Sequence, residues 1–288
     1  MIDLFSAEGV AALERIAHAK TLYAFDFDGT LAPIVELPDY AAAAASTVSL
    51  LSRLGTLVPT VILTGRAVDD IRRRIAFTPL HLVGNHGAEG VPDRLHHSLA
   101  DSLGARGGNA AHREVVQGWL AQWPAAIAAQ ADVPGIFIEP KSYSLSVHHR
   151  LAEDQDAAIR VIHAAIGRLE PAPRIIGGKC VFNLLPEGAP DKGSALRSLV
   201  QFEQSDGAFF IGDDLTDEAA FENAPASWMT VRVGLSEDSS ARYFIATQGD
   251  IDRCLQHLLA HVEAAATRQP SVDTAEDHGH AGEGLPGR

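Results

Sequence analysis

The sequence is short of cysteine, positive charge and long apolar runs, and each shortage argues against a class of protein. Its two cysteines, Cys180 and Cys254, form no CxxC or Cys/His zinc spacing, which favours buried, reduced thiols. Lysine and arginine total 23 against 37 acidic residues, giving a formal net charge of −14. This balance repels phosphate backbones, so we expect no nucleic-acid partner.

The apolar segments are all shorter than the roughly 20 residues that span a bilayer, so we expect no membrane partner. The opening stretch MIDLFSAEGVAALERIAHAK has no basic segment followed by an apolar one, which argues against a secretory signal peptide. We therefore expect a cytoplasmic protein that is a monomer or a small homo-oligomer.

Short apolar segments alternate with helical ones in a rhythm typical of α/β proteins. Residues 22–27, 58–65 and 80–87 are predicted strands, and residues 41–54 and 67–76 are predicted helices. Strands that alternate with helices favour right-handed βαβ units. The sequence thus predicts a doubly wound, Rossmann-like parallel sheet.

This rhythm breaks near Val91, where two predicted strands, a helix and two further strands indicate a small inserted α+β domain. After this insertion the βα alternation resumes. The last part of the chain has few apolar residues, which predicts a disordered tail. We expect a first core part at 1–91, an inserted cap at 92–184, a second core part at 185–266 and the tail at 267–288.

Polar residues follow three predicted strands, and a lysine begins the helix that returns the chain to the core. The residues are Asp26 and Asp28 after the first strand, Thr64 after the second, Lys192, and Asp213 and Asp214 after the strand AFFI. Each feature alone is equally typical of a turn or a helix cap. Because ligands bind at the carboxyl ends of parallel strands, all four are expected to meet at one site.

The chemistry that suits these residues is phosphoryl transfer through a covalent intermediate. Asp26 is the candidate nucleophile, because a carboxylate can attack phosphorus and form an aspartyl phosphate. Asp28 is the candidate general acid and base, while Lys192 and Thr64 balance charge on the phosphoryl oxygens. Mg²⁺ suits such a cluster. Its candidate ligands are Asp26, Asp28, Asp213 and Asp214, and the sequence leaves open whether Asp214 or Asp217 assists Asp213.

At these motifs the chain resembles the haloacid-dehalogenase-like phosphatases. Their four motifs match Asp26-Phe27-Asp28-Gly29-Thr30, Thr64, Lys192 and Gly212-Asp213-Asp214. The resemblance covers the predicted core and implies that Asp26 is the nucleophile. It also implies a large α/β cap that sets specificity for the leaving group, and Asp28 favours rapid hydrolysis of the phosphoenzyme.

Within that superfamily the segments LTGR, GNHGAEG, EPKSYSLSVHHR, GGKCVFNLLPEGAPDKGSAL and GDDLTDEAAF resemble trehalose-6-phosphate phosphatases. Two positions depart from that family: Asn183 stands where Glu is common, and His149 where Tyr is usual. With this resemblance, the candidate substrate-binding residues are Arg66, Asn85, His86, Lys141, His148, Arg150, Lys179, Asn183 and Glu187. Asn85 and His86 lie on a loop near the hinge, where a structural turn is an equal alternative.

The resemblance implies hydrolysis of trehalose 6-phosphate to trehalose and phosphate, a step of trehalose biosynthesis. Because Asn183 departs from the family, another sugar phosphate, of the sucrose or mannose phosphate type, stays open as the substrate. A non-catalytic sugar-phosphate sensor is a third hypothesis. It requires a broken catalytic set, and every member of the set is present in this sequence.

Overall fold

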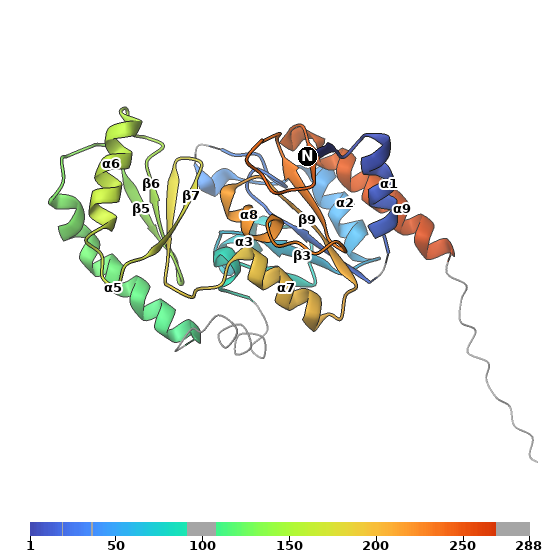
Figure 1. The fold of residues 1–288 in the computed structure, drawn as a ribbon, viewed down its shortest axis with the longest axis horizontal. Helices are drawn as coiled ribbons and strands as arrows, with labels where there is room; N and C mark the ends of the chain where they lie inside the picture. Colours follow the sequence, from blue (N-terminus) through green and yellow to red (C-terminus); the bar gives the residue numbers. More distant parts are fainter. Residues whose placement is uncertain (19, 36, 91–107, 269–288) are drawn as a thin grey trace, which may run out of the picture.

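A seven-stranded parallel sheet forms the centre of the larger part of the molecule (Figure 1). The computed structural model describes residues 1–18, 20–35, 37–90 and 108–268. The strand order is β1-β11-β10-β9-β2-β3-β4. The strands are β1 (Ile2–Asp3), β2 (Thr21–Phe25), β3 (Thr60–Leu63), β4 (His81–Val83), β9 (Gly207–Gly212), β10 (Met229–Val233) and β11 (Tyr243–Ile245).

Helices cover both faces of this sheet, as expected for a doubly wound fold. They are α1 (Ala7–Ile16), α2 (Ala45–Gly55), α3 (Val68–Arg74), α7 (Lys192–Phe202), α8 (Leu215–Phe221) and α9 (Ile251–Arg268), with single 3-10 turns at Pro38–Tyr40, Asn85–Gly87 and Gln248–Asp250. Successive residues of β2 serve opposite faces. Tyr23 and Phe25 pack in the core under α1, α2 and α9, whereas Leu22 and Ala24 pack under α7 and α8.

A four-stranded antiparallel sheet forms the inserted cap, in the order β5-β6-β8-β7. Its elements are α5 (Gly108–Ala128), β5 (Phe137–Pro140), β6 (Leu145–His148), α6 (Gln155–Ile166), β7 (Arg174–Gly178) and β8 (Val181–Leu185). Trp119 of α5 and Ile162 of α6 pack against Leu145 and Leu184 on one face of the sheet. The predicted α+β insertion is therefore confirmed.

The other face of the cap sheet is turned toward the core, and pairing between strands orders its side chains in rows. Glu139, Ser146 and Asn183 are cross-strand neighbours, and Phe137, His148 and Val181 form the next row. All six side chains line a cavity between cap and core. The strand alternation that fills the cap core thus also places polar groups over the core sheet.

The structure extends the core beyond the predicted elements. Strands β1 and β11 and helices α1 and α9 were not predicted, and α9 continues to Arg268. The first two residues of the predicted disordered tail are therefore helical. Residues 91–107 and 269–288 lie outside the described residues, so the predicted boundary near residue 92 and the rest of the tail stay predictions. In the part of the chain that the structure describes, no helix combines the length and apolar character needed to cross a membrane.

Candidate active site

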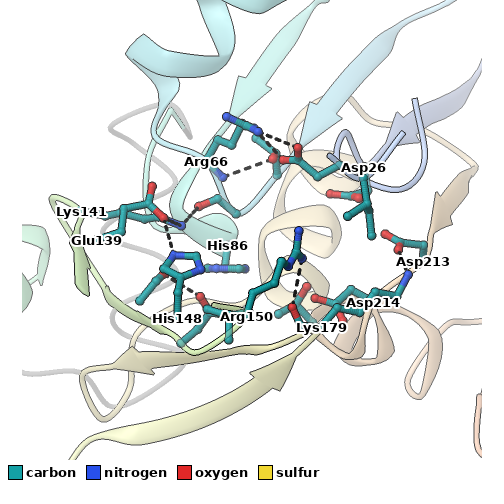
Figure 2. Close-up of a pocket in the computed structure, with 18 of the residues that line it drawn as sticks. Asp26, Arg66, His86, Glu139, Lys141, His148, Arg150, Lys179, Asp213 and Asp214 are labelled. Carbon is teal, nitrogen blue, oxygen red and sulfur yellow. Dashed lines mark hydrogen bonds and ion pairs between the residues drawn. The ribbon is translucent and has the colours of Figure 1, made fainter. Parts of the chain in front are cut away.

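The carboxyl ends of β2, β3 and β9 open into a cavity of about 290 Å³ that the cap sheet covers (Figure 2). This volume lies at the lower end of the range for small-molecule sites. Its walls come from core loops and from cap strands. Asp213 and Asp214 lie on one side of the view in Figure 2, and Glu139 and Lys141 lie on the other.

A buried lysine joins two of the carboxylates at the floor of this cavity. Lys192 Nζ donates to Asp26 Oδ1 at 2.7 Å and to Asp217 Oδ1 at 2.6 Å, and the residue is only 2% exposed. Lys192 is the first residue of α7, where Asp191 caps the helix and fixes its start. Burial disfavours the ammonium, but Asp217 and Asp26 outweigh burial and raise the pKa of Lys192.

Three buried carboxylates could hold a cation beside this lysine. One oxygen from each of Asp26, Asp213 and Asp217 lies within 4.8 Å of the others. Asp213 Oδ1 is buried and has no hydrogen-bond partner among the described residues. An all-oxygen, carboxylate-rich donor set of this kind fits a hard cation such as Mg²⁺.

Electrostatics also favours a cation at this cluster. Burial raises the pKa of Asp26 well above its ordinary value, and the neighbouring Asp217 and Asp213 act in the same direction against Lys192. Burial likewise raises the pKa of Asp213 to about 6, although Lys179 opposes the shift. Excess negative charge is thus concentrated in a site from which water is largely excluded.

Two predicted magnesium ligands, Asp28 and Asp214, do not belong to this cluster of three. Asp214 is the N-cap of α8 and accepts a hydrogen bond from Leu215 N at 2.8 Å. The side chain of Asp217, three residues later, points back toward the N-cap residue, and its Oδ2 accepts a hydrogen bond from Asp214 N at 2.9 Å. Its other oxygen accepts from Lys192, so of the two carboxylates left open as the partner of Asp213, Asp217 is the one that joins the cluster.

Glycine allows the loop after β2 to approach the carboxylates. Gly29 has φ +86°, and a Cβ at this position would lie 2.2 Å from Asp213 Oδ2. Asp26 N also donates to Ile211 O of β9 at 2.9 Å, which joins the two loops. The turn predicted from Asp28-Gly29-Thr30 therefore exists, and it brings the first and last motifs into contact.

Asp28 faces the cavity but is paired with an arginine. Arg66 Nε and Nη2 donate to its two oxygens at 2.6 and 2.7 Å, and Arg66 Nη1 donates to Asp70 at 2.7 Å. Two such parallel hydrogen bonds fix the orientation of a carboxylate. Thr64 also lines the cavity, and its hydroxyl accepts from Arg66 N at 3.2 Å.

Cap side chains reach down to the core at three points. Lys141 Nζ donates to Gly65 O at 3.0 Å, Arg150 donates to Val35 O at 2.9 Å, and Lys179 Nζ lies 2.5 Å from Asp213 Oδ2. These contacts place three cations of the cap around the cavity. They also hold the cap against the loops that carry the carboxylates.

A second polar group of the cap surrounds Glu139. His148 Nε2 lies 2.9 Å from Glu139 Oε2, and Lys141 Nζ lies 3.7 Å from the same oxygen. Burial raises the pKa of Glu139, but the hydrogen bond from His148 and the charge of Lys141 lower it to about 2. Asn183 accepts from Ser146 Oγ at 2.8 Å on the neighbouring strand. The cap thus presents both charged and neutral groups to the cavity.

Comparison with known proteins identifies the family to which this arrangement belongs. The trehalose-phosphatase family model matches residues 24–247, from β2 to the start of the last helical segment. This chain belongs to the trehalose-phosphatase family. A trehalose-phosphate phosphatase from Mycobacterium avium is 33% identical over 206 residues, which cover 69% of this chain and 50% of that protein. The chain thus spans about half the length of the curated relatives it matches.

Solved structures agree with the trehalose-phosphatase fold. A crystal structure described as a trehalose-6-phosphate phosphatase related protein has a TM-score of 0.66 and 25% identity, and the match covers 86% of this chain and all of that one. The sucrose-phosphatase from Synechocystis has a TM-score of 0.52 at 18% identity over 83% of this chain and 98% of that one, so it shares the fold alone. The predicted core sheet with an inserted cap is confirmed.

Two residues expected to bind substrate in this trehalose-phosphatase family member do not line the cavity. Glu187 is exposed on the turn after β8. Asn85 is fully buried, and its side chain donates to Glu89 Oε2 at 2.6 Å. The other candidates, Arg66, His86, Lys141, His148, Arg150, Lys179 and Asn183, all line it.

The cavity also contains residues that the sequence analysis did not select. Glu139 is central to the polar group of the cap, although it begins the segment EPKSYSLSVHHR that carried the resemblance. Glu139 lies on β5, which ends at Pro140 before Lys141, so strand alternation alone did not single it out. Ile34, Leu37 and Leu151 add an apolar part to the wall, and no motif indicated them.

The carboxylate cluster predicts that Mg²⁺ stabilises the folded protein. A ligand present at 100 times its dissociation constant adds about 2.7 kcal/mol to the free energy of unfolding. We expect Mg²⁺ to raise the melting temperature of the wild type measured by calorimetry, and Asp217→Asn to remove this rise. EDTA should also reduce phosphate release to background.

Asp214→Asn is the matched control for that experiment, because Asn is as good an N-cap as Asp. This variant should keep the Mg²⁺-dependent rise in melting temperature. A rise that survives Asp217→Asn but disappears in Asp214→Asn would restore the original assignment of Asp214 as the ligand.

Proposed function

We propose that this protein is a Mg²⁺-dependent phosphatase that hydrolyses trehalose 6-phosphate to trehalose and phosphate. The observation that carries the proposal is the position of Asp26. Its carboxylate is held by Lys192 at the carboxyl end of β2, beside Asp213 and Asp217, in a chain of the trehalose-phosphatase family. We choose trehalose 6-phosphate as the substrate because the curated relatives are named trehalose-phosphate phosphatases. The proposed reaction belongs to trehalose biosynthesis.

In the proposed first step, a carboxylate oxygen of Asp26 attacks phosphorus. A bond forms between this oxygen and phosphorus, and the bond between phosphorus and the sugar oxygen breaks. Asp28, which lines the cavity, protonates the departing sugar oxygen. Lys192 and Thr64 stabilise negative charge on the phosphoryl oxygens.

In the second step, water attacks phosphorus and releases phosphate from Asp26. Asp28 takes the proton from this water, so the residue that served as acid now serves as base. Asp28 is then protonated again, and Asp26 is again a free carboxylate. Bound Mg²⁺, held by Asp26, Asp213 and Asp217, would neutralise charge between the carboxylates and the phosphate. The cap covers the site and limits access of bulk water.

The cap residues support a phosphorylated sugar as the substrate class. Lys141, Arg150 and Lys179 bring positive charge to the cavity, which suits a phosphate monoester. Glu139, His148 and Asn183 can bind sugar hydroxyls, each of which both donates and accepts hydrogen bonds. Arg66 contacts the general acid Asp28 and also lines the cavity, where it can bind the phosphate or a sugar hydroxyl.

Asn183 favours a second candidate substrate of the sucrose or mannose phosphate type. It lies in the polar row of the cap sheet and lines the cavity. A neutral amide at this position replaces the carboxylate that is common in the family. A carboxylate can only accept a hydrogen bond from a sugar hydroxyl, whereas an amide can also donate one. The chemistry at Asp26 would be the same for this substrate.

A phosphate-release screen with Mg²⁺ tests the choice between these substrates. We expect the kcat/KM for trehalose 6-phosphate to exceed that for glucose 6-phosphate, sucrose 6-phosphate and mannose 6-phosphate by at least about tenfold, since one missing contact is worth about 1–3 kcal/mol. Equal turnover of glucose 6-phosphate and trehalose 6-phosphate would contradict the proposal. Asp26→Asn, purified in parallel, controls for contaminating phosphatases.

A further inference from the structure

His86 lies on a backbone turn that fixes the direction of its ring. Asn85 and His86 have φ values of 47° and 56°, in the left-handed region that most residues avoid but that Asn and His adopt more often than others. Glu89 Oε2 holds this turn by accepting from Asn85 Nδ2 at 2.6 Å and from Val68 N at 2.9 Å. His86 N donates to Thr64 O at 3.0 Å. The fold therefore holds two consecutive left-handed residues next to a catalytic loop.

The His86 ring is buried at the edge of the cavity, with the Asn183 side chain of the cap domain close by. The residue is 5% exposed and lines the cavity together with Thr64 and Gly65. A Cβ at Gly65 would lie 2.4 Å from His86 Cε1, so the ring packs directly on this glycine. By distance and angle neither Nδ1 nor Nε2 has a hydrogen bond of good geometry within the described part of the chain, and the Asn183 side chain is a polar neighbour close enough to affect the ring. Leaving such buried groups unpaired costs about 1–3 kcal/mol, which a ligand can offset.

The surroundings of His86 favour the neutral ring. Burial lowers the pKa of His86 well below its usual 6.5, and the charges of Lys141, Lys192 and Arg174 act in the same direction, against a smaller opposing effect of Asn183. A neutral imidazole has one N–H donor and one nitrogen acceptor. A sugar hydroxyl also has one donor and can accept, whereas a phosphate dianion can only accept. The ring is therefore complementary to a hydroxyl.

We propose that His86 binds a hydroxyl of the sugar ring that carries the phosphate and so contributes to substrate specificity. This inference rests on the proposed phosphatase function. His86 belongs to the phosphorylated ring because it contacts the Thr64–Gly65 loop and lies near both Lys192 of the catalytic cluster and Lys141 of the cap. The left-handed turn orients the His86 ring, and the ring nitrogens form the proposed hydrogen bonds to one hydroxyl of the sugar.

Deoxygenated substrates test this contact directly. The probes are trehalose 6-phosphate and its 2-, 3- and 4-deoxy analogues on the phosphorylated ring, with p-nitrophenyl phosphate as a substrate without sugar hydroxyls. For the wild type, we expect one analogue to have a kcat/KM about tenfold lower, the contribution of one hydrogen bond. In His86→Asn the penalty for this analogue should fall below about twofold.

Two variants keep the experiment interpretable. Asn adopts the left-handed conformation readily and preserves the turn, while His86→Phe keeps an aromatic ring and removes both nitrogens. Both should lower kcat/KM for trehalose 6-phosphate about tenfold and leave p-nitrophenyl phosphate turnover within about twofold of the wild type. His261→Asn, on α9 outside the cavity, is the matched control and should change neither substrate.

Equal losses on p-nitrophenyl phosphate and on trehalose 6-phosphate in both variants would show a structural role for His86 and overturn the inference. The inference would also be overturned if the deoxy analogue kept its roughly tenfold lower kcat/KM, relative to trehalose 6-phosphate, in both variants. A preference for another sugar phosphate in the substrate screen would instead contradict the proposed function alone. The deoxy analogues of that preferred sugar phosphate would then test His86 in the same way.

Discussion

Replacing Asp26 by Asn is expected to abolish phosphate release, by a factor on the order of 10⁴ to 10⁶, while the protein keeps its fold. The amide cannot attack phosphorus, so the aspartyl phosphate does not form. Its oxygen can still accept from Lys192 Nζ, which lies 2.7 Å from Asp26 Oδ1. Steady-state phosphate release measures the loss, and far-UV circular dichroism with thermal unfolding measures the fold.

Asp69→Asn is a suitable control, because this aspartate is 82% exposed on α3 and the chemical change is the same. It should retain wild-type turnover. Because burial raises the pKa of Asp26, neutralising this residue removes an unfavourable buried charge. We therefore expect unchanged or higher stability in Asp26→Asn. Substantial turnover in this variant would refute the assignment of the nucleophile.

Replacing Lys192 by Met is expected to remove activity and also to destabilise the protein. Its ammonium lies between Asp26 and Asp217, and removal leaves these buried carboxylates without their shared positive charge. Breaking a buried ion pair by removing one partner lowers the free energy of unfolding by about 3–5 kcal/mol. Urea denaturation at pH 7 without Mg²⁺ measures this change, and a phosphate-release assay measures activity.

The matched control is Lys20→Met, since Lys20 is an exposed lysine. An exposed substitution of this kind should alter the free energy of unfolding by less than about 0.5 kcal/mol. Mg²⁺ should restore part of the stability of Lys192→Met, because a cation can replace some of the missing charge, but it should not restore turnover. Unchanged stability without Mg²⁺ would mean that the carboxylates do not depend on Lys192.

The meeting of the four core motifs could be predicted from the sequence because it depends on sheet topology. β2 pairs with both β3 and β9, so the residues that follow these strands reach the same edge of the sheet. Asp26, Thr64 and Asp213 were therefore expected together, and each lines the cavity. Apolar strands that end at polar residues give a signal that depends little on side-chain detail.

The choice between Asp214 and Asp217 depends on local geometry at the start of α8. Both residues follow β9, but the N-cap position directs Asp214 to its own helix, whereas the third helical position turns Asp217 back toward Lys192. The spacing of three residues between two acidic side chains was a capping signal in the sequence. The sequence left open which of Asp214 and Asp217 assists Asp213, and the geometry at the start of α8 now favours Asp217.

The missed substrate-facing residues have a different cause. Whether Glu187 or Glu139 faces the cavity depends on how the cap packs on the core, a long-range property that strand alternation does not determine. The orientation of Asn85 depends on a left-handed turn that most residues disfavour. The pairing of Asp28 with Arg66 likewise joins two loops across the sheet edge, and neither motif indicates it alone.

The ion pair between Lys179 and Asp213 links two binding events. Lys179 belongs to the cap and Asp213 to the core, so the contact exists only while these parts adjoin. A ligand that draws Lys179 away weakens the hold of the cap, and by thermodynamic reciprocity a separated cap leaves Asp213 more attractive to a cation. A cation at Asp213 and the ion pair with Lys179 would draw on the same carboxylate, so we expect each to weaken the other.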